Sequence, residues 1–332
     1  MADLSTKYMG LELRNPIVVA SSGLTDTVDD IVKLDQNGAG AVVLKSIFEE
    51  QILLEAEYNL KKMKEDSFAY DDYSETLDYI DVHIKEKEVG NYLELIKQAK
   101  AKVSIPVIAS INAVTALEWT SFSKQIEKAG ADAIELNIFV MPFDTDKECH
   151  ENEEVYYKIL KRVKENVNIP VSVKLSPYFS NLGKVLLNLE KEGADALVLF
   201  NRFSAPDIDI ENIKTTHAEI FSTKREMYNV LRWMGIMSNK LNADLAATTG
   251  IHDGEDVIKM LLAGAKVTQI SSTLYLNGVG HITKMLNDIH DWMDKKGFLY
   301  VDQFRGKLAH QADDNNNVYE RMQFMRYFSE IK

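Results

Sequence analysis

The chain has 332 residues, of which 45% are hydrophobic and 27% charged, a composition typical of a globular protein with a large core. Its formal net charge of -13, without a long basic run, argues against nucleic acid as a partner, because most of the surface would repel an extended polyanion. Its single cysteine, Cys149, excludes an internal disulfide framework, a four-cysteine zinc site and a self-contained iron–sulfur cluster.

The N-terminal residues predict neither export nor membrane anchoring. Residues 1–21 lack the basic start and the unbroken apolar core of a signal peptide. Elsewhere no apolar run is long enough to span a bilayer. We therefore expect a soluble cytoplasmic protein with no membrane partner and no bound metal.

Four stretches of the chain resemble one another, and each predicts a helix end, a turn and a buried strand. They are residues 38–44, 130–136, 193–199 and 264–270. Four further apolar runs predict strands, several of them after an X-Pro step that favours extended backbone. These runs are 17–20, 107–110, 171–174 and 245–247.

Amphipathic segments such as 120–128 and 155–165 separate these eight predicted strands. The alternation of strand and helix predicts an α/β protein of the (β/α)8 TIM-barrel type. A doubly wound open sheet is the alternative architecture. We expect one domain over residues 1–332, with a core of about 13–290 and a helical tail of about 291–332. The tail packs on the barrel or on a neighbouring copy, so a homodimer is one expectation.

Two connections, after strands two and six, are longer than a simple helix requires. The first contains a polar, tyrosine-rich stretch at residues 70–79, before a helix expected near 91–100. This stretch is either a lid or a solvated insertion. The second connection, 202–224, ends in a capping-box pattern that starts the helix carrying Trp233.

The last two strand–helix units, within residues 244–275, predict a phosphate site. One strand runs into Thr248, Thr249 and Gly250, and the next is followed by Ser271-Ser272-Thr273. Small residues let backbone N–H groups approach a ligand, and the last two loops of such barrels commonly hold a phosphate. Either loop alone is explained by turn and cap residues. The pair together favours the phosphate site.

The other predicted strands also end in polar residues. In chain order these ends are Ala20-Ser21-Ser22-Gly23, Lys45-Ser46, Ser110-Ile111-Asn112, Asn137, Lys174 and Asn201. Each has an ordinary explanation, since a strand-end Asn turns the chain and a Lys reaches to water. Converging on one barrel mouth, they favour a flat, hydrogen-bonding, electron-accepting ligand with a phosphate at one end. A fixed ammonium there would stabilise negative charge in a reduced flavin.

Several motifs across the barrel match one known family. They are L-R-N-P-I at 13–17, A-S-S-G at 20–23, L-K-S at 44–46, E-L-N at 135–137, V-K-L-S-P at 173–177, and Asn201. In these motifs the chain resembles the FMN-dependent dihydroorotate dehydrogenases over about residues 13–275. The resemblance implies a (β/α)8 barrel that binds FMN. It also implies oxidation of dihydroorotate, or a related cyclic amide, to orotate in pyrimidine biosynthesis.

By motif match, the resemblance also implies site residues. Those expected to contact FMN are Ala20, Ser21, Gly23, Lys45, Ser46, Asn112, Asn137, Lys174, Asn201, Thr249, Gly250, Ser272 and Thr273. Within this set, Asn137 and Asn201 match the asparagines that hold the pyrimidine substrate, and Lys174 is a candidate catalytic residue.

The chain departs from the family's pattern in the substrate half. The family's loop after strand four resembles N-x-S-C-P-N and supplies a Cys or Ser base, whereas residues 137–143 read N-I-F-V-M-P-F. Cys149, followed by His150, is the candidate base in this region, and an incidental cysteine at a helix entry is the alternative. The substrate segment after strand two is not evident, and Thr248-Thr249 stands where the family often has Gly-Gly.

Three functions remain open on the sequence. The first is a flavin oxidoreductase with a small-molecule substrate and a soluble electron acceptor, since no membrane-binding extension precedes the barrel. The second is a lyase or isomerase whose phosphate site holds the substrate, with Lys174 as a base or Schiff-base amine. The third is a non-catalytic flavin-binding homologue.

Overall fold

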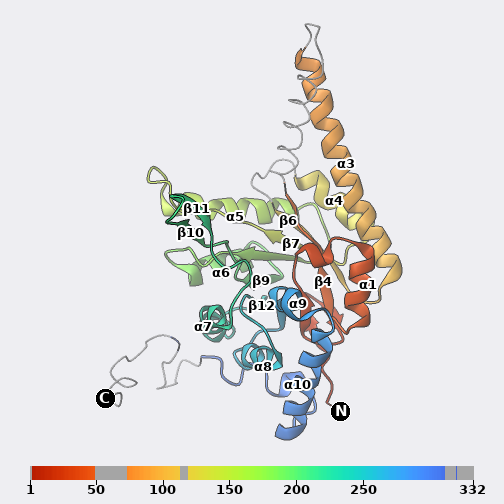
Figure 1. The fold of residues 1–332 in the computed structure, drawn as a ribbon, viewed down its shortest axis with the longest axis vertical. Helices are drawn as coiled ribbons and strands as arrows, with labels where there is room; N and C mark the ends of the chain where they lie inside the picture. Colours follow the sequence, from red (N-terminus) through yellow and green to blue (C-terminus); the bar gives the residue numbers. More distant parts are fainter. Residues whose placement is uncertain (1, 49–72, 113–118, 311–318, 320–332) are drawn as a thin grey trace.

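Eight parallel strands close into a barrel in the computed structural model, which describes residues 2–48, 73–112, 119–310 and 319 (Figure 1). Their order is β4-β3-β13-β12-β9-β8-β7-β6, and β6 pairs with β4 to close the ring. The strands are β3 (Ile17–Val19), β4 (Ala41–Val43), β6 (Val107–Asn112), β7 (Ala133–Asn137), β8 (Val171–Leu175), β9 (Ala196–Leu199), β12 (Asp244–Thr248) and β13 (Val267–Ile270). The predicted (β/α)8 barrel is confirmed, and the open sheet is wrong.

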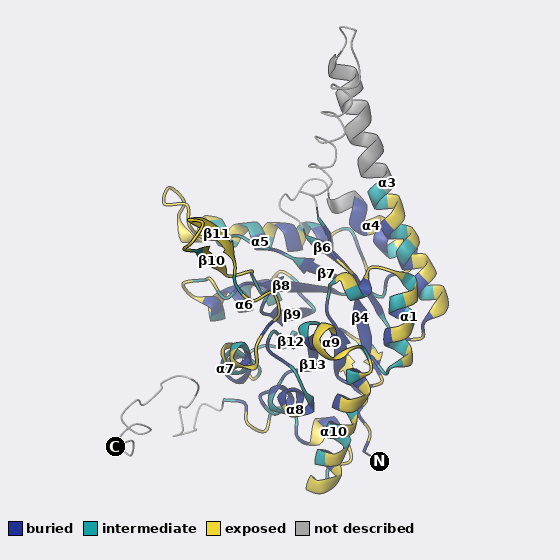
Figure 2. Cartoon of the chain, in the orientation of Figure 1, coloured by how far each residue is buried: buried dark blue, intermediate teal, exposed yellow. Residues whose placement is uncertain are grey.

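Helices surround the barrel and cover the outer faces of its strands (Figure 2). They are α1 (Val28–Gln36), α3 (Tyr73–Lys102), α4 (Trp119–Ala129), α5 (Cys149–Lys164), α6 (Leu182–Lys191), α7 (Met227–Met237), α8 (Gly254–Leu262), α9 (Ser272–Asn277) and α10 (His281–Lys296). Both helices expected at 120–128 and 155–165 are present. Helix α3 begins at Tyr73, well before the expected start near 91, and residues 70–72 lie outside the described residues.

The four similar sequence stretches share one backbone conformation. Gly38, Gly130, Gly193 and Gly264 each follow a helix, with φ between 96° and 109°. A left-handed residue after a helix ends it and turns the chain, and glycine adopts that conformation without the penalty of a side chain. The repeat in the sequence is therefore the repeated turn from helix into strand.

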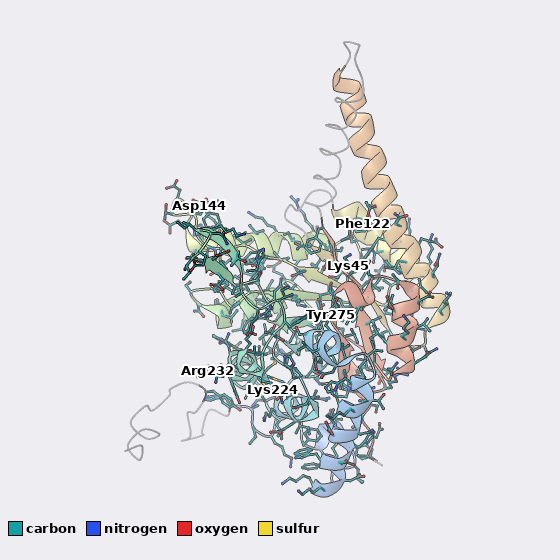
Figure 3. All side chains as sticks on the ribbon, viewed as in Figure 1. Lys45, Phe122, Asp144, Lys224, Arg232 and Tyr275 are labelled. Atoms are coloured by element: carbon teal, nitrogen blue, oxygen red, sulfur yellow. The ribbon has the colours of Figure 1, made fainter. Side chains whose placement is uncertain are left out.

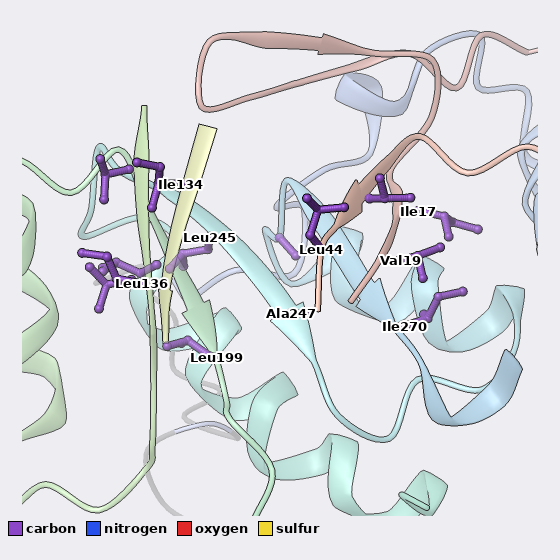
Figure 4. Close-up of a cluster of buried hydrophobic side chains, with 14 of the residues drawn as sticks. Ile17, Val19, Leu44, Ile134, Leu136, Leu199, Leu245, Ala247 and Ile270 are labelled. Atoms are coloured by element: carbon purple, nitrogen blue, oxygen red, sulfur yellow. The ribbon is translucent and has the colours of Figure 1, made fainter. Parts of the chain in front are cut away.

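The hydrophobic core has two parts, because successive strand residues point to opposite faces. Outward residues such as Ile17, Ile134 and Leu245 pack against the helices (Figure 4). Inward residues such as Val18 and Ile108 fill the barrel. An N-terminal hairpin of β1 (Thr6–Tyr8) and β2 (Leu11–Leu13) contributes its own side chains to this inner cluster.

Two short additions accompany the barrel strands. Strand β5 (Ile47–Phe48) pairs with β6 beyond the end of β4. The long connection after β9 contains an antiparallel hairpin of β10 (Pro206–Asp209) and β11 (Lys214–His217), which the sequence did not predict. Its residues are mostly exposed, so no apolar alternation marked it.

The described part of the C-terminal tail packs on the barrel. After α10 and a short 3-10 turn, η3 (Val301–Gln303), the chain runs over α8 and α7 in an irregular path. Gly306 N donates to Leu261 O at 2.9 Å, and His310 N donates to Gly235 O at 2.8 Å. Residues 311–318 and 320–332 of the expected helical tail lie outside the described residues. The domain boundaries and the homodimer stay predictions.

Candidate functional site

An open pocket lies at the carboxyl ends of β3, β8, β9, β12 and β13. It contains about 550 Å³ of empty space, part of it open to solvent. Seven residues expected to contact a cofactor line it: Ala20, Ser21, Lys174, Asn201, Thr249, Gly250 and Ser272. The same wall includes Phe200, Arg202, Ser222 and Gln269, which the sequence did not single out.

One end of the pocket is formed by the loop after β12. Thr249 and Gly250 have φ values of 79° and 76°, a left-handed pair that turns the chain sharply at the end of the strand. Thr249 Oγ1 donates to Phe200 O at 3.1 Å, so this hydroxyl fixes the neighbouring strand end. A Cβ on Gly250 would lie 2.4 Å from Met227 N, so the start of α7 requires glycine there, whatever the ligand.

The same end of the pocket includes the start of α9. Ser272 Oγ accepts a hydrogen bond from Ser222 N at 3.1 Å, which leaves its own hydroxyl proton available to a ligand. Ser222 Oγ and His252 Nε2 lie 3.1 Å apart. Thr273 is buried, and its hydroxyl donates to His252 O at 2.9 Å. The first backbone N–H groups of a helix have no intrahelical partner, so Ser272 offers the pocket both an N–H and a hydroxyl.

Lys174, also in the pocket wall, belongs to a buried polar trio that joins three strands. Lys174 Nζ donates to Gln269 Oε1 at 3.3 Å and lies 3.6 Å from Glu135 Oε1. Gln269 Nε2 donates to Glu135 Oε2 at 2.5 Å, which completes a ring of contacts. Lys174 and Gln269 line the pocket, whereas Glu135 is fully buried behind them. In the sequence, Glu135 and Gln269 interrupt largely apolar strands, and this pattern could have indicated the trio.

Three serines from successive strands support the pocket wall at Ser21. Ser21 Oγ lies 3.0 Å from Ser46 Oγ, which lies 2.7 Å from Ser110 Oγ. Tyr92 OH donates to Ser110 O at 3.0 Å and accepts from Ser110 N at 2.7 Å. Ser46 is therefore placed behind Ser21 and supports it.

Arg202 fixes the loop that borders the pocket between β11 and α7. Its guanidinium donates to Glu226 Oε2 at 2.8 Å and to the backbone oxygens of Glu219, Ile220 and Phe221 at 2.7–3.2 Å. Burial alone would raise the pKa of Glu226, but the hydrogen bond from Arg202 brings that pKa below its usual value. The Arg202 side chain is thus occupied with the protein itself.

Comparison with known proteins decides the family. A family model described as dihydroorotate dehydrogenase matches residues 3–293. The chain belongs to the dihydroorotate dehydrogenase family. A relative from Thermoplasma volcanium is 30% identical over 312 residues, covering 92% of this chain and 98% of that protein. A relative from Thermoplasma acidophilum is 28% identical over 313 residues, covering 92% and 99%. Both are named dihydroorotate dehydrogenase B (NAD(+)), catalytic subunit.

Dihydroorotate dehydrogenases are oxidoreductases and, as a family, depend on a flavin. The donor set of the pocket suits a phosphorylated flavin. Ser272 and the loop at Thr249 and Gly250 present hydroxyl and backbone groups to the pocket, and Lys174 lines the same pocket with its ammonium. A phosphate group and an electron-accepting ring need these two kinds of partner.

Several residues expected to contact the cofactor lie elsewhere than in the pocket wall. Lys45, labelled in Figure 3, is exposed and forms a 2.8 Å ion pair with Asp26. Gly23 begins a 3-10 turn (η1, Gly23–Thr25), where a Cβ would lie 2.9 Å from Tyr275 OH. Asn112 ends β6, next to residues 113–118, which lie outside the described residues.

Asn137 and Asn201, the pair expected to bind a substrate, meet at the pocket wall, to which Asn201 belongs. Asn137 is the last residue of β7, and Asn201 lies two residues after β9. Asn201 Nδ2 donates to Asn137 Oδ1 at 2.5 Å. Two residues further along each loop, Phe139 stacks on Phe203 with 3.8 Å between ring centroids. The two loops are therefore joined by a polar contact and an aromatic contact.

The candidate base Cys149 does not line the pocket. It is exposed and is the first residue of α5. It borders a separate cavity, together with Val140, Tyr156 and Tyr178. Tyr156 OH accepts a hydrogen bond from Val140 N at 3.1 Å, which fixes the loop after β7 between this cavity and the barrel.

Metal-binding clusters and membrane-spanning helices are both absent from the described residues. No group of three or more His, Cys, Asp or Glu side chains there is arranged to hold a metal ion. In the same residues, no helix combines the length and the apolar character needed to cross a membrane.

Proposed function

We propose that this protein binds FMN in the pocket and oxidises dihydroorotate, or a related cyclic amide, to orotate in pyrimidine biosynthesis. One observation carries the proposal: the Lys174 trio and the phosphate-sized loops meet at one pocket of a barrel that belongs to the dihydroorotate dehydrogenase family. The names of the relatives support the substrate.

The two groups of pocket residues have different tasks in this proposal. Ser272, with the backbone of Thr249 and Gly250, binds the FMN phosphate. The hydroxyls of Thr249 and Thr273 already donate to backbone oxygens of the protein, so they only shape the loops. Lys174 lies near the ring, where a bound FMN would accept two electrons from the substrate. Asn137 and Asn201 exchange their mutual bond for bonds to a ring amide and orient the substrate.

The electron acceptor belongs to the same proposal. The relatives carry NAD(+) and catalytic subunit in their names, which favours a soluble acceptor reached through a further subunit. The single, unpaired cysteine supports a cytoplasmic location.

The surroundings of Lys174 argue against the lyase alternative. A Schiff-base lysine is activated by an apolar pocket or a second cation. Lys174 instead lies in a polar setting, 3.6 Å from the buried Glu135 carboxylate and 3.3 Å from Gln269 Oε1.

The test begins with the purified protein. We expect it to be yellow, to release FMN on denaturation, and to lose its visible flavin absorbance when dihydroorotate is added without oxygen. Lys174→Ala should weaken FMN binding by a factor of about ten or more, because it loses a charged contact worth ~1.5–3 kcal/mol. The control is Lys184→Ala, at an exposed lysine on α6, which should bind FMN as the wild type does. A colourless protein that takes up no FMN contradicts the proposal. A yellow protein that dihydroorotate does not reduce contradicts the substrate alone.

A further inference from the structure

The Lys174 trio contains a feature that fold stability does not explain. Glu135 Oε1 is buried and has no hydrogen-bond partner among the described residues, and its compensation is the ammonium of Lys174 at 3.6 Å. Buried ion pairs are weak contributors to stability, because desolvation offsets their attraction. A buried polar atom left without a hydrogen bond calls for another explanation.

The arrangement places opposite charges at different depths below the pocket. Lys174 lines the pocket, whereas Glu135 lies behind it and does not. Gln269 holds both, since it accepts from the ammonium at 3.3 Å and donates to the carboxylate at 2.5 Å. A ligand in the pocket therefore meets the positive charge first and the negative charge from further away.

The effect of the Glu135 charge extends to other buried groups. Tyr8, from the N-terminal hairpin, is fully buried inside the barrel. Burial raises the pKa of Tyr8 well above its usual value, and the negative charge of Glu135 raises it further. Charges act over longer distances in such an interior than in water.

We propose that Glu135 and Gln269 are positioning residues that hold the Lys174 ammonium at the pocket wall and set the midpoint potential of the bound flavin. The inference rests on the proposed function. A reduced flavin carries more negative charge than an oxidised one, so the ammonium favours the reduced form and the carboxylate opposes it. The potential is then set by the difference between the two contributions.

A cycle of charge-neutralising variants separates the contributions. Glu135→Gln keeps the size of the side chain and removes the negative charge, so the midpoint potential should shift to more positive values. Lys174→Met removes the positive charge, so it should shift the potential to more negative values and weaken flavin binding. The double variant removes both charges, and its potential should lie between those of the single variants. Ser172→Ala, a buried β8 residue outside the trio, is the control for the titration, and its midpoint potential should match that of wild type.

The measurements are spectroelectrochemical titration of the flavin-loaded full chain, flavin affinity of the apoprotein, and thermal unfolding. The melting temperature is a second test of the ion pair, because a charge left without its partner in the interior destabilises the fold. Each single variant should therefore melt at a lower temperature than the double variant.

Opposite shifts in potential, with the double variant between them, support the inference. Equal potentials in wild type, Glu135→Gln and the double variant overturn it and leave the proposed function intact. A single variant that does not fold, beside a double variant that folds and holds flavin at an altered potential, also supports it. A wild-type protein that takes up no flavin overturns the proposed function and this inference with it.

Discussion

Asn201 donates a 2.5 Å hydrogen bond to Asn137, so the ends of β9 and β7 are joined across the end of β8, the strand that carries Lys174. Both side chains keep further donors and acceptors that this contact does not use. The pair is therefore positioned before a ligand arrives. A ring amide could take its place between the two side chains without large movement of either strand.

Asn201→Ala should raise the KM for dihydroorotate by about tenfold or more, because each lost hydrogen bond is worth ~0.5–1.5 kcal/mol and the variant loses at least two. Steady-state kinetics of the FMN-loaded enzyme measure the effect. Asn188→Ala, which removes a 3.3 Å contact to Tyr157 on the outer helices, is the matched control. An unchanged KM in Asn201→Ala would assign this pair a purely structural role.

The architecture could be predicted from the sequence because its signals are local. A glycine such as Gly193, followed by an apolar run, specifies a turn and a strand within a few residues. Eight such strands, each separated by amphipathic segments, left little choice of fold. The β10–β11 hairpin was missed because its exposed residues show no apolar alternation.

The site was predicted less completely, because side-chain direction and partners depend on distant residues. Gln269 and Glu135 are 134 positions apart and meet only through the closure of the barrel. Lys45 follows a barrel strand as predicted, yet it pairs with Asp26 on the surface. Strand position alone does not decide which way a long, flexible side chain turns.

Two buried tyrosines should respond in opposite ways to removal of their hydroxyl groups. Tyr92→Phe leaves both backbone groups of Ser110 without their partner and should cost about 2 kcal/mol of unfolding free energy. The Tyr8 hydroxyl makes no hydrogen bond of normal geometry to a described residue, so Tyr8→Phe should be neutral or stabilising by up to about 1 kcal/mol. Urea denaturation of both variants beside wild type measures the difference. Equal losses would mean that the Tyr8 hydroxyl is hydrogen-bonded after all.

Alkaline pH should destabilise the fold through these same tyrosines. Burial raises the pKa values of Tyr8, Tyr92 and Tyr156 in the folded protein. In the unfolded chain the phenols ionise near pH 10, so this stability is complete below about pH 10 and is lost as the pH rises toward the folded values. Urea midpoints should therefore fall between about pH 9 and 11. Tyr92→Phe, although less stable at neutral pH, should show a smaller fall, and an identical slope would contradict the assignment.

Gly250 should tolerate a side chain less well than a glycine with the same backbone conformation. Gly250 and Gly10 have φ values of 76° and 78°, so alanine at either position carries a similar left-handed penalty of about 1–2 kcal/mol. An added Cβ at Gly10 meets no atom within 4 Å, whereas at Gly250 it would lie 2.4 Å from Met227 N and 2.8 Å from Thr223 O. Gly250→Ala should thus be less stable than Gly10→Ala by more than about 1 kcal/mol. Equal stability in thermal or urea unfolding would show that α7 can move away.

Cys149→Ala should reduce its flavin with dihydroorotate at the wild-type rate. Loss of a general base slows a proton transfer by roughly 100-fold or more, but Cys149 is exposed at the start of α5 and borders the cavity outside the barrel mouth. Anaerobic stopped-flow measurements of flavin reduction make the comparison, with Asn201→Ala as the variant that shows the assay responds to the site. A drop of about 100-fold in Cys149→Ala would mean that the loop after β7 brings the thiol to the substrate, and the sequence-based assignment of Cys149 as the base would stand.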